Sequence, residues 1–164
     1  MNAEETILKL NKHFPALEAV SPRYMRVNTA FTDPKSFEEA LYYANEKLGY
    51  HKGKHIIGTD EGADIGISYI LSNDDNVLLV LRERVSKSAP NVRSMGELYP
   101  SLVLHERELV DLFGVHVSGL PEGPRYPLPD CWPEGQYPLR KEWNPAYFNK
   151  QTMTYEPPKE DDAK

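Results

Sequence analysis

The amino-acid sequence predicts an α+β fold, in which helices pack on a small mixed sheet and an extended, Pro/aromatic-rich C-terminal arm follows. Two observations support this prediction. Apolar residues recur at helical spacing in some segments of residues 3–113 and at strand spacing in others. Nine of the 14 prolines lie in residues 120–164, where they exclude regular helix and interior strand. At 164 residues, the chain has the length of one domain with its own core.

The chain begins with a predicted helix, strand and second helix. The first helix covers residues 3–13 and ends before Pro15, because proline disfavours helical geometry in the residue before it. Residues 23–31 are predicted to form a strand. The second helix is clearly marked, since Asp33 is a suitable N-cap, proline follows at the first helical position, and Gly49 ends the pattern. Its apolar positions are Phe37, Leu41, Ala44 and Leu48.

A β-hairpin is predicted in the middle of the chain. It follows a loop rich in His, Lys and Gly that includes His51–His55. Apolar residues alternate with smaller or polar ones over residues 65–71, and the polar stretch 72–76 leads into a second strand over residues 77–85. Because residues 77–81 are apolar without alternation, we expect this strand to lie centrally and to be covered on both faces.

The last predicted regular element is helical. Ser94 and Glu97 have the spacing of a capping box, and the helical pattern continues from there to about Phe113. Pro100 is expected to divide this segment into two.

The amino-acid composition becomes rich in proline and aromatic residues beyond Gly119, and this change predicts a division of the chain. Residues 1–118 are expected to form the α+β domain, residues 119–150 an extended partner-binding arm, and residues 151–164 a flexible tail. Seven aromatic residues would serve no purpose in a fully solvated segment, so we expect the arm to lie on another surface; the alternative is a disordered tail. These aromatic residues are Tyr126, Trp132, Tyr137, Trp143, Tyr147, Phe148 and Tyr155.

Composition excludes several classes of function. The net charge of −6 provides no positive field that would draw the chain onto nucleic acid. Cys131 is the only cysteine, which excludes an internal disulfide, a four-cysteine zinc site and a cysteine-ligated iron–sulfur cluster in this chain. The longest apolar run is far shorter than the ~20 residues of a membrane span, and the N-terminus does not resemble a signal segment. We therefore expect a cytoplasmic chain or one peripheral to a membrane.

Residues 102–113 place an acid within an apolar helix face. At about 100° per residue, six apolar side chains share an arc of about 180°, and Glu106 lies inside it. An unpaired buried carboxylate is costly, so Glu106 must bind an arginine or backbone donors, or keep a proton through a raised pKa. Arg107 and Asp111 are expected to pair on the opposite side. The six apolar residues are Leu102, Val103, Leu109, Val110, Leu112 and Phe113.

Other chemical interpretations of the motifs are weak. His105-Glu106 begins like a zinc-protease motif, but Leu109 occupies the place of the second histidine, so no metal site is expected. Glu106 and Glu108 point about 200° apart, which excludes paired carboxylates acting on one substrate. The basic residues of His51–His55 leave open an anion site, and with it a free-standing soluble anion-binding enzyme, although a solvated loop is the simpler interpretation.

A signature within the helical segment resembles a known family. The run Glu106-Arg107-Glu108, followed by Asp111-Leu112-Phe113, is similar to the motif of the 30-kilodalton (C-type) subunit family of respiratory complex I and its hydrogenase relatives. After this run Leu120 stands where the family has His or Lys, and Pro124 stands where it has Arg, with Arg125 one residue later.

The arm is similar to a narrower group within that family. Residues 128–135 and 137–143 resemble the tails of membrane-bound nickel–iron hydrogenase members. The archaeal energy-converting hydrogenases have the most similar tails. The specific resemblance therefore covers residues 94–145.

The resemblance implies a non-catalytic subunit of a membrane-bound, ferredoxin-linked hydrogenase that evolves hydrogen coupled to ion translocation. Such a subunit has no cofactor of its own and docks against the nickel–iron large subunit, with iron–sulfur clusters in the small partner subunits. It would be peripheral, on the cytoplasmic side of the cell membrane. The same role in a sulfane-reducing complex or an NADH/ferredoxin:quinone oxidoreductase is the alternative that the resemblance leaves open.

The resemblance also selects residues for structural and interface roles, with no catalytic or metal-binding residue among them. Glu106, Arg107, Glu108 and Asp111 form the family signature. The expected interface residues are Arg125, Trp132, Tyr137, Arg140, Lys141 and Trp143.

Overall fold

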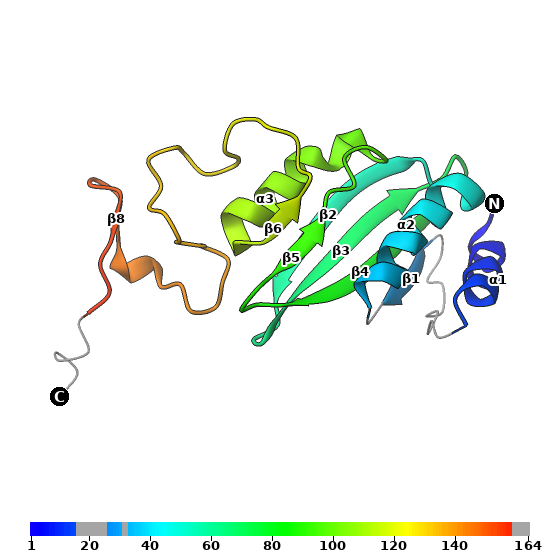
Figure 1. Ribbon diagram of the computed structural model, residues 1–164, viewed down its shortest axis with the longest axis horizontal. Helices are drawn as coiled ribbons and strands as arrows, with labels where there is room; N and C mark the ends of the chain where they lie inside the picture. Colours follow the sequence, from blue (N-terminus) through cyan, green and yellow to red (C-terminus); the bar gives the residue numbers. More distant parts are fainter. Residues whose placement is uncertain (16–25, 31–32, 159–164) are drawn as a thin grey trace.

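The computed structural model describes residues 1–15, 26–30 and 33–158. It has the predicted α+β fold, with helices beside a mixed sheet (Figure 1). The arm leaves the domain at the end opposite the first helix. The ends of the predicted strand, residues 23–25 and 31, lie outside the described residues. The elements of the domain are α1 (Ala3–His13), β1 (Arg26–Ala30), α2 (Pro34–Leu48), β2 (Lys52–Asp60), β3 (Asp64–Ser72), β4 (Leu78–Ser86), β5 (Asn91–Arg93), the 3₁₀ helix η1 (Pro100–Leu102), α3 (Val103–Phe113) and β6 (His116–Ser118). The arm contains the 3₁₀ helix η2 (Pro145–Tyr147), β7 (Phe148–Asn149) and β8 (Thr154–Tyr155).

The first two helices begin and end where local chemistry requires. The Asn2 side chain accepts a hydrogen bond from the Glu5 amide, and the Glu5 carboxylate accepts one from the Asn2 amide, which completes a capping box for α1. Asp33 caps α2 through the Lys35 and Ser36 amides, as predicted. Gly49 ends α2 with a left-handed φ of 74°, which glycine adopts without a Cβ clash.

The main sheet has the strand order β1-β4-β3-β2. The pairs β2–β3 and β3–β4 are antiparallel, and the pair β3–β4 confirms the predicted hairpin. Strand β1 is parallel to β4. Strand β4 lies in the interior of the sheet, as predicted. Its burial alternates, however: Leu79 and Leu81 are buried, while Leu78 and Val80 on the other face are only partly buried. The prediction of full cover on both faces is therefore wrong.

The prediction of a loop rich in His, Lys and Gly is also wrong, because residues 52–60 form the edge strand β2. Ile56 is buried opposite Tyr69 of β3, and this pairing orders the strand despite its polar composition. The pairing register shifts between Gly53 and His55. Charged residues and an irregularity are typical of an edge strand, since both oppose pairing with other chains.

Helices α2 and α3 cover the same face of the sheet (Figure 1). Phe37 of α2 packs edge-on against Tyr69, with 5.4 Å between ring centroids. Gly58 lies in the row of Ile67, two residues from Tyr69 and therefore on the same face. A Cβ at position 58 would lie 2.5 Å from the Phe113 ring of α3. The glycine thus allows α3 to approach the sheet closely.

The segment between the sheet and α3 differs from the prediction. Residues 94–99 are not helical, and Pro100 begins η1 instead of dividing a longer helix. The expected Ser94–Glu97 capping box is absent, because the Ser94 hydroxyl hydrogen-bonds to Glu106. The fold of the chain brings Glu106 near Ser94, and the hydroxyl that was predicted to cap a helix binds this acid instead.

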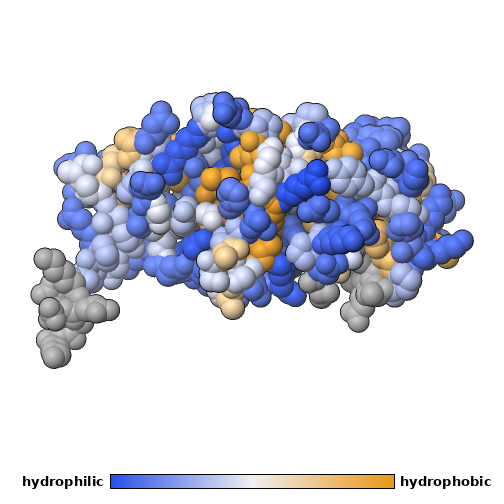
Figure 2. Space-filling view, in the orientation of Figure 1, coloured by the Kyte–Doolittle hydropathy of each residue, from blue (hydrophilic) through white to orange (hydrophobic). Residues whose placement is uncertain are grey.

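Helices in the described ranges are too short and too polar to cross a bilayer. The face in Figure 2 is mostly hydrophilic, and its apolar residues gather near the middle of the molecule.

We predict that Gly58→Ala lowers the free energy of unfolding by about 1 to 3 kcal/mol, because the added methyl group overpacks the contact between β2 and α3. Gly66→Ala in β3 is the matched control. A Cβ at position 66 would meet the Thr59 hydroxyl and the ends of the Glu61 and Arg82 side chains, which can rotate away more readily than a packed ring, so urea denaturation should detect a smaller change. Equal costs for the two variants would contradict the close approach of α3.

Candidate functional site

The N-terminal part of α3 is held by the buried acid that the sequence predicted. Glu106 is 0% exposed. One of its carboxylate oxygens accepts a hydrogen bond from the Met95 amide at 2.7 Å, and the other accepts one from the Ser94 hydroxyl at 2.6 Å. Burial raises the pKa of Glu106, and these two donors oppose that rise. Glu106 therefore fastens α3 to the segment that follows β5.

A second buried acid of α3, Asp111, binds the arm. Asp111 is 7% exposed. Its carboxylate accepts from Arg125 Nε at 2.9 Å and from the Leu128 amide at 3.1 Å. Arg125 also donates to the Trp132 carbonyl at 3.2 Å. The predicted pairing of Arg107 with Asp111 is therefore wrong. Asp111 is buried beneath the arm, while Val110, predicted to lie in the apolar arc, is 36% exposed.

Arg107 contacts the arm through backbone carbonyls. Its guanidinium donates to the Pro121 carbonyl at 2.5 Å and to the Pro124 carbonyl at 3.2 Å. A Cβ at Gly123 would lie 2.4 Å from Arg107 Nη2, so this glycine leaves space for the guanidinium. The proline-rich chain has few amide donors but retains its carbonyls, and the arginine uses these carbonyls as acceptors.

The arm also covers the C-terminal end of α3. The Leu139 amide donates to the Leu112 carbonyl at 3.2 Å, and Arg140 Nε donates to the Phe113 carbonyl at 2.7 Å. Carbonyls at a helix C-terminus lack partners within the helix and attract cations. Arg140 also lies over the Tyr137 ring, with 4.6 Å from its Cζ to the ring centroid.

A third set of contacts joins the arm to the turn between β2 and β3. Lys87 Nζ lies 2.6 Å from Asp60 and 2.5 Å from Glu142 of the arm. Asp60 also accepts from the Lys141 amide at 2.8 Å. Burial raises the pKa of Asp60, but the hydrogen bonds from Lys87, Lys141 and Gly62 outweigh it and lower that pKa to about 2.

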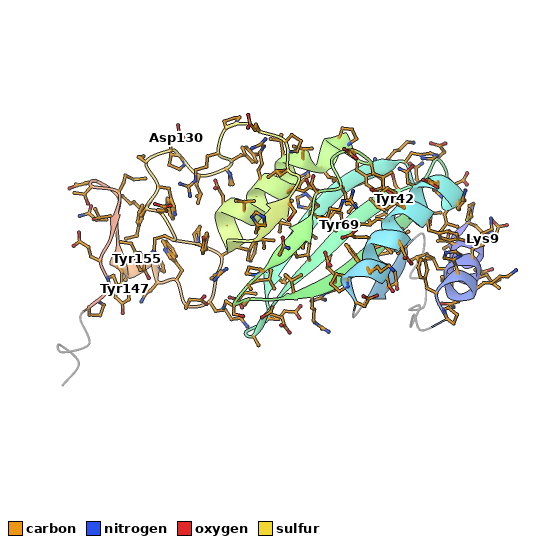
Figure 3. All side chains as sticks on the ribbon, in the orientation of Figure 1. Lys9, Tyr42, Tyr69, Asp130, Tyr147 and Tyr155 are labelled. Atoms are coloured by element: carbon orange, nitrogen blue, oxygen red, sulfur yellow. The ribbon has the colours of Figure 1, made fainter. Side chains whose placement is uncertain are left out.

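The outer part of the arm forms an aromatic cluster. The Trp132 ring lies 4.5 Å from Phe148 and 5.9 Å from Trp143, measured between centroids, and Trp143 stacks on Tyr155 at 5.8 Å. Figure 3 shows Tyr147 and Tyr155 beside each other at this end, far from Tyr69 in the domain. None of residues 119–158 is fully buried. We call Trp132, Trp143, Tyr147, Phe148 and Tyr155 the arm cluster.

Two histidines, His55 of β2 and His105 of α3, lie beside each other. His55 Nδ1 lies 3.4 Å from His105 Nε2, and His105 Nδ1 lies 3.3 Å from Glu108. Within the described residues, no group of three or more His, Cys, Asp or Glu side chains is placed to hold a metal ion. The basic residues of the predicted loop lie just before and within β2, where Lys52 pairs with Asp74 at 2.8 Å, and an anion site there stays a hypothesis.

The structure brings together most of the residues that the sequence selected, but through contacts that the sequence did not predict. Arg125 and Arg140 were predicted as interface cations, and both bind groups of α3. The Lys141 side chain is exposed, and the Trp143 indole N–H has no hydrogen-bond partner among the described residues. Asp111 and Arg125 are 14 positions apart, and no periodic signal in the sequence reveals their pairing. An interface role for the selected residues stays a prediction, as does the division of the chain at residue 118.

The fold and these contacts define a class of protein: an α+β domain whose last helix anchors a structured C-terminal arm. A profile of the respiratory-chain NADH dehydrogenase 30 Kd subunit family matches residues 30–149. The chain belongs to this family, as the signature in α3 indicated.

Relatives of the chain are subunits of several oxidoreductase complexes. The C subunit of F(420)H(2) dehydrogenase from Methanosarcina mazei is 28% identical over 148 residues, which is 87% of this chain and 92% of that protein. The C subunit of NADH-quinone oxidoreductase from Roseiflexus castenholzii is 35% identical over 100 residues, 58% of this chain and 56% of that protein. Formate hydrogenlyase subunit 5 of Escherichia coli is 34% identical over 92 residues, 53% of this chain but only 16% of that longer protein.

Two solved structures share the fold. A chain of the membrane-bound sulfane sulfur reductase, an archaeal respiratory membrane complex, superposes with a TM-score of 0.74 at 22% identity, covering 86% of this chain and 85% of that one. The trypsin-resistant fragment of Nqo5 gives a TM-score of 0.63 at 19% identity and covers 73% of this chain and 98% of that fragment.

We predict that Glu106→Ala lowers the free energy of unfolding by about 2 to 4 kcal/mol, because it leaves the buried Met95 amide without an acceptor. Glu106→Gln keeps an oxygen for that amide and should cost clearly less. Chemical denaturation measures both. A Glu106→Ala protein as stable as the wild type would contradict the anchoring of α3.

A second prediction concerns the end of α3. Gly114 and Gly49 end α3 and α2, and both have a left-handed φ, 65° and 74°. A Cβ at position 49 would have no atom within 4 Å, whereas a Cβ at position 114 would lie 2.4 Å from the Tyr137 ring. Gly49→Ala should therefore cost only the backbone strain, about 1 kcal/mol, and Gly114→Ala should in addition displace the arm.

Tryptophan emission measures that displacement directly, because Trp132 and Trp143 are the only two tryptophans of the chain and both lie in the arm. Gly114→Ala should shift the emission towards that of solvated indole, while Gly49→Ala should leave it unchanged. The same spectrum for both variants would mean that Tyr137 does not hold the arm on α3.

Proposed function

We propose that this chain is a non-catalytic docking subunit in the hydrophilic part of a membrane-bound, ferredoxin-linked hydrogenase that evolves hydrogen coupled to ion translocation. The nickel–iron large subunit is its principal partner, and the cluster-bearing small subunits are its neighbours. The chain lies peripherally, on the cytoplasmic side of the membrane, through its contacts with the complex. It contributes position and electrostatics, and the redox centres belong to its partners.

The observation that carries this proposal is the construction of the arm. Its inner part is fixed to α3 and to Asp60, so its position on the domain is defined. Its outer part groups aromatic side chains that the chain itself leaves only partly buried. Aromatic residues of this kind are enriched in protein interfaces. An anchored arm with an incompletely buried aromatic end is suited to bind a second polypeptide.

Two relatives favour the hydrogenase setting within this family. Formate hydrogenlyase subunit 5 and hydrogenase-4 component G of Escherichia coli match at 34% and 33% identity. Their matched regions cover about half of this chain, 53% in each case. The similarity of residues 128–135 and 137–143 to hydrogenase tails adds a reason that is specific to the arm.

The test is to tag the chain in its native host, solubilise the membranes gently and identify the proteins that co-purify. The eluate is assayed for nickel, iron and hydrogen evolution. We expect nickel together with a large subunit. An iron-rich, nickel-free assembly would move the chain to a sulfane-reducing or quinone-reducing complex and contradict the hydrogenase assignment. A lone soluble protein would contradict the docking role itself.

We further predict that a chain ending at residue 143 stays folded but recovers at least tenfold less of its partners in that purification. This truncation retains the contacts of Arg125, Arg140 and Lys141, and it removes Phe148 and Tyr155 from the arm cluster. Removal of the whole arm is a poorer test, because it also deprives the buried Asp111 of Arg125. Full recovery of partners by the shortened chain would contradict the role of the arm cluster.

A further inference from the structure

A pocket of about 480 Å³ opens beside the start of the arm, away from the contacts described above. It lies between the N-terminal part of α2, strand β4 and strand β5. Its lining includes the apolar residues Phe37, Val92 and Met95 and the carboxyl group of Glu83 of β4. Glu38 and Arg93 add charged groups to its lining.

Glu83 is buried without a partner. It is 5% exposed, on the same covered face of the sheet as Ile67. Within the described residues, no hydrogen bond or ion pair reaches its carboxyl group, and burial followed by repulsion from Glu38 raises its pKa to about 8. Buried acids elsewhere in this chain have donors, as Glu106 and Asp111 do. A carboxyl group left unpaired in an apolar pocket lacks the partner that usually compensates its burial.

The charges around the pocket indicate whether a group that binds Glu83 would be positive or negative. Glu38 of α2 adds a second carboxylate, and Arg93 of β5 lies 3.7 Å from Glu38. Tyr69 of β3, whose pKa burial raises, stays neutral. Glu106 of α3 is already held by Ser94 and Met95. When Glu83 is ionised, the charges of Glu83, Glu38 and Arg93 therefore leave one negative charge in excess, and one further cation would balance it.

We propose that the Glu83 pocket receives one cationic side chain, the guanidinium of arginine or the ammonium of lysine, which a partner subunit inserts beside the Glu83 carboxylate. The partner rests on the function proposed above, whereas the cation site rests on this chain's own residues. Ser118, the last residue of the domain, and Gly119, the first residue of the arm, also line the pocket. The arm thus begins at the pocket, and a partner that extends along the arm back to the domain reaches both. A charge-assisted pair with the cation would supply the donors that Glu83 lacks.

The cation site is tested first on the isolated full-length chain with ethylguanidinium and ethylammonium as side-chain probes. Carboxyl NMR of Glu83 is followed against pH with and without probe, at concentrations on the order of 10 mM, as expected for ligands this small. The expected result is a lower pKa of Glu83 with either probe and shifted signals of Val92 and Met95. Tetramethylammonium, which has no hydrogen-bond donor, should have a much smaller effect. A pKa of Glu83 that neither probe lowers would overturn the cation site.

The partner's role is tested in the assembled complex with Glu83→Gln and, as matched control, Glu39→Gln at an exposed position of α2. The folded pKa of Glu83 lies above its ordinary value of 4.5, so its stabilising effect is complete below about pH 4.5 and is lost as the pH rises through about 8. At pH 8.5, Glu83→Gln should therefore melt at the same temperature as the isolated wild-type chain or higher. In the purification, the same variant should recover at least tenfold less partner, whereas Glu39→Gln should match the wild type in both assays.

The outcomes separate the two proposals. If the wild-type chain recovers its partners and Glu83→Gln recovers them equally well, the inserted cation is overturned and the docking function stands. If the wild-type chain recovers no partner, the docking function fails, and with it the source proposed for the cation. If Glu83→Gln melts well below the wild-type chain at pH 8.5, Glu83 has a structural role in the isolated chain, which overturns the unpaired state on which the proposal rests.

Discussion

The structure depends on how helix α3 satisfies its polar groups. Two acids on this helix are buried on different sides: Glu106 is held by the segment after β5, and Asp111 is held by the arm. The carbonyls of Leu112 and Phe113 at its C-terminal end receive donors from residues 139 and 140 of the arm. Since buried carboxylates and helix ends must find donors, α3 fixes the arm to the domain. The arm is thus part of the fold at its inner end and free to bind at its outer end.

Features set by neighbouring residues were predictable from the sequence. The caps of α2, the β3–β4 hairpin and the burial of Glu106 all follow from local spacing and turn chemistry. The family signature was recognisable for the same reason, since its residues lie within one helix. The interior position of β4 was also predicted correctly, although the cover on both faces from which it was inferred is incomplete.

Features that depend on distant contacts were not predictable. Lys52–Asp60 is polar enough to suggest a loop, yet pairing with β3 orders it as an edge strand. Asp111 is four residues from Arg107, a spacing that predicts a surface pair, but Arg125 binds it instead. Ser94 has a local capping partner in Glu97 and binds Glu106, which is 12 residues away. In each case a tertiary contact replaced a weaker local one. The Glu83 pocket likewise exists only where α2, β4 and β5 meet.

The central claim is that the arm is anchored at its inner end and binds a partner at its outer end. Amide hydrogen exchange, compared between the isolated chain and the purified complex, tests this claim most directly. The account predicts that residues 103–113 are equally protected in both states and that the protection of residues 144–158 rises in the complex. Protection of residues 144–158 that is the same in both states, with new protection confined to surfaces away from the arm, would contradict it.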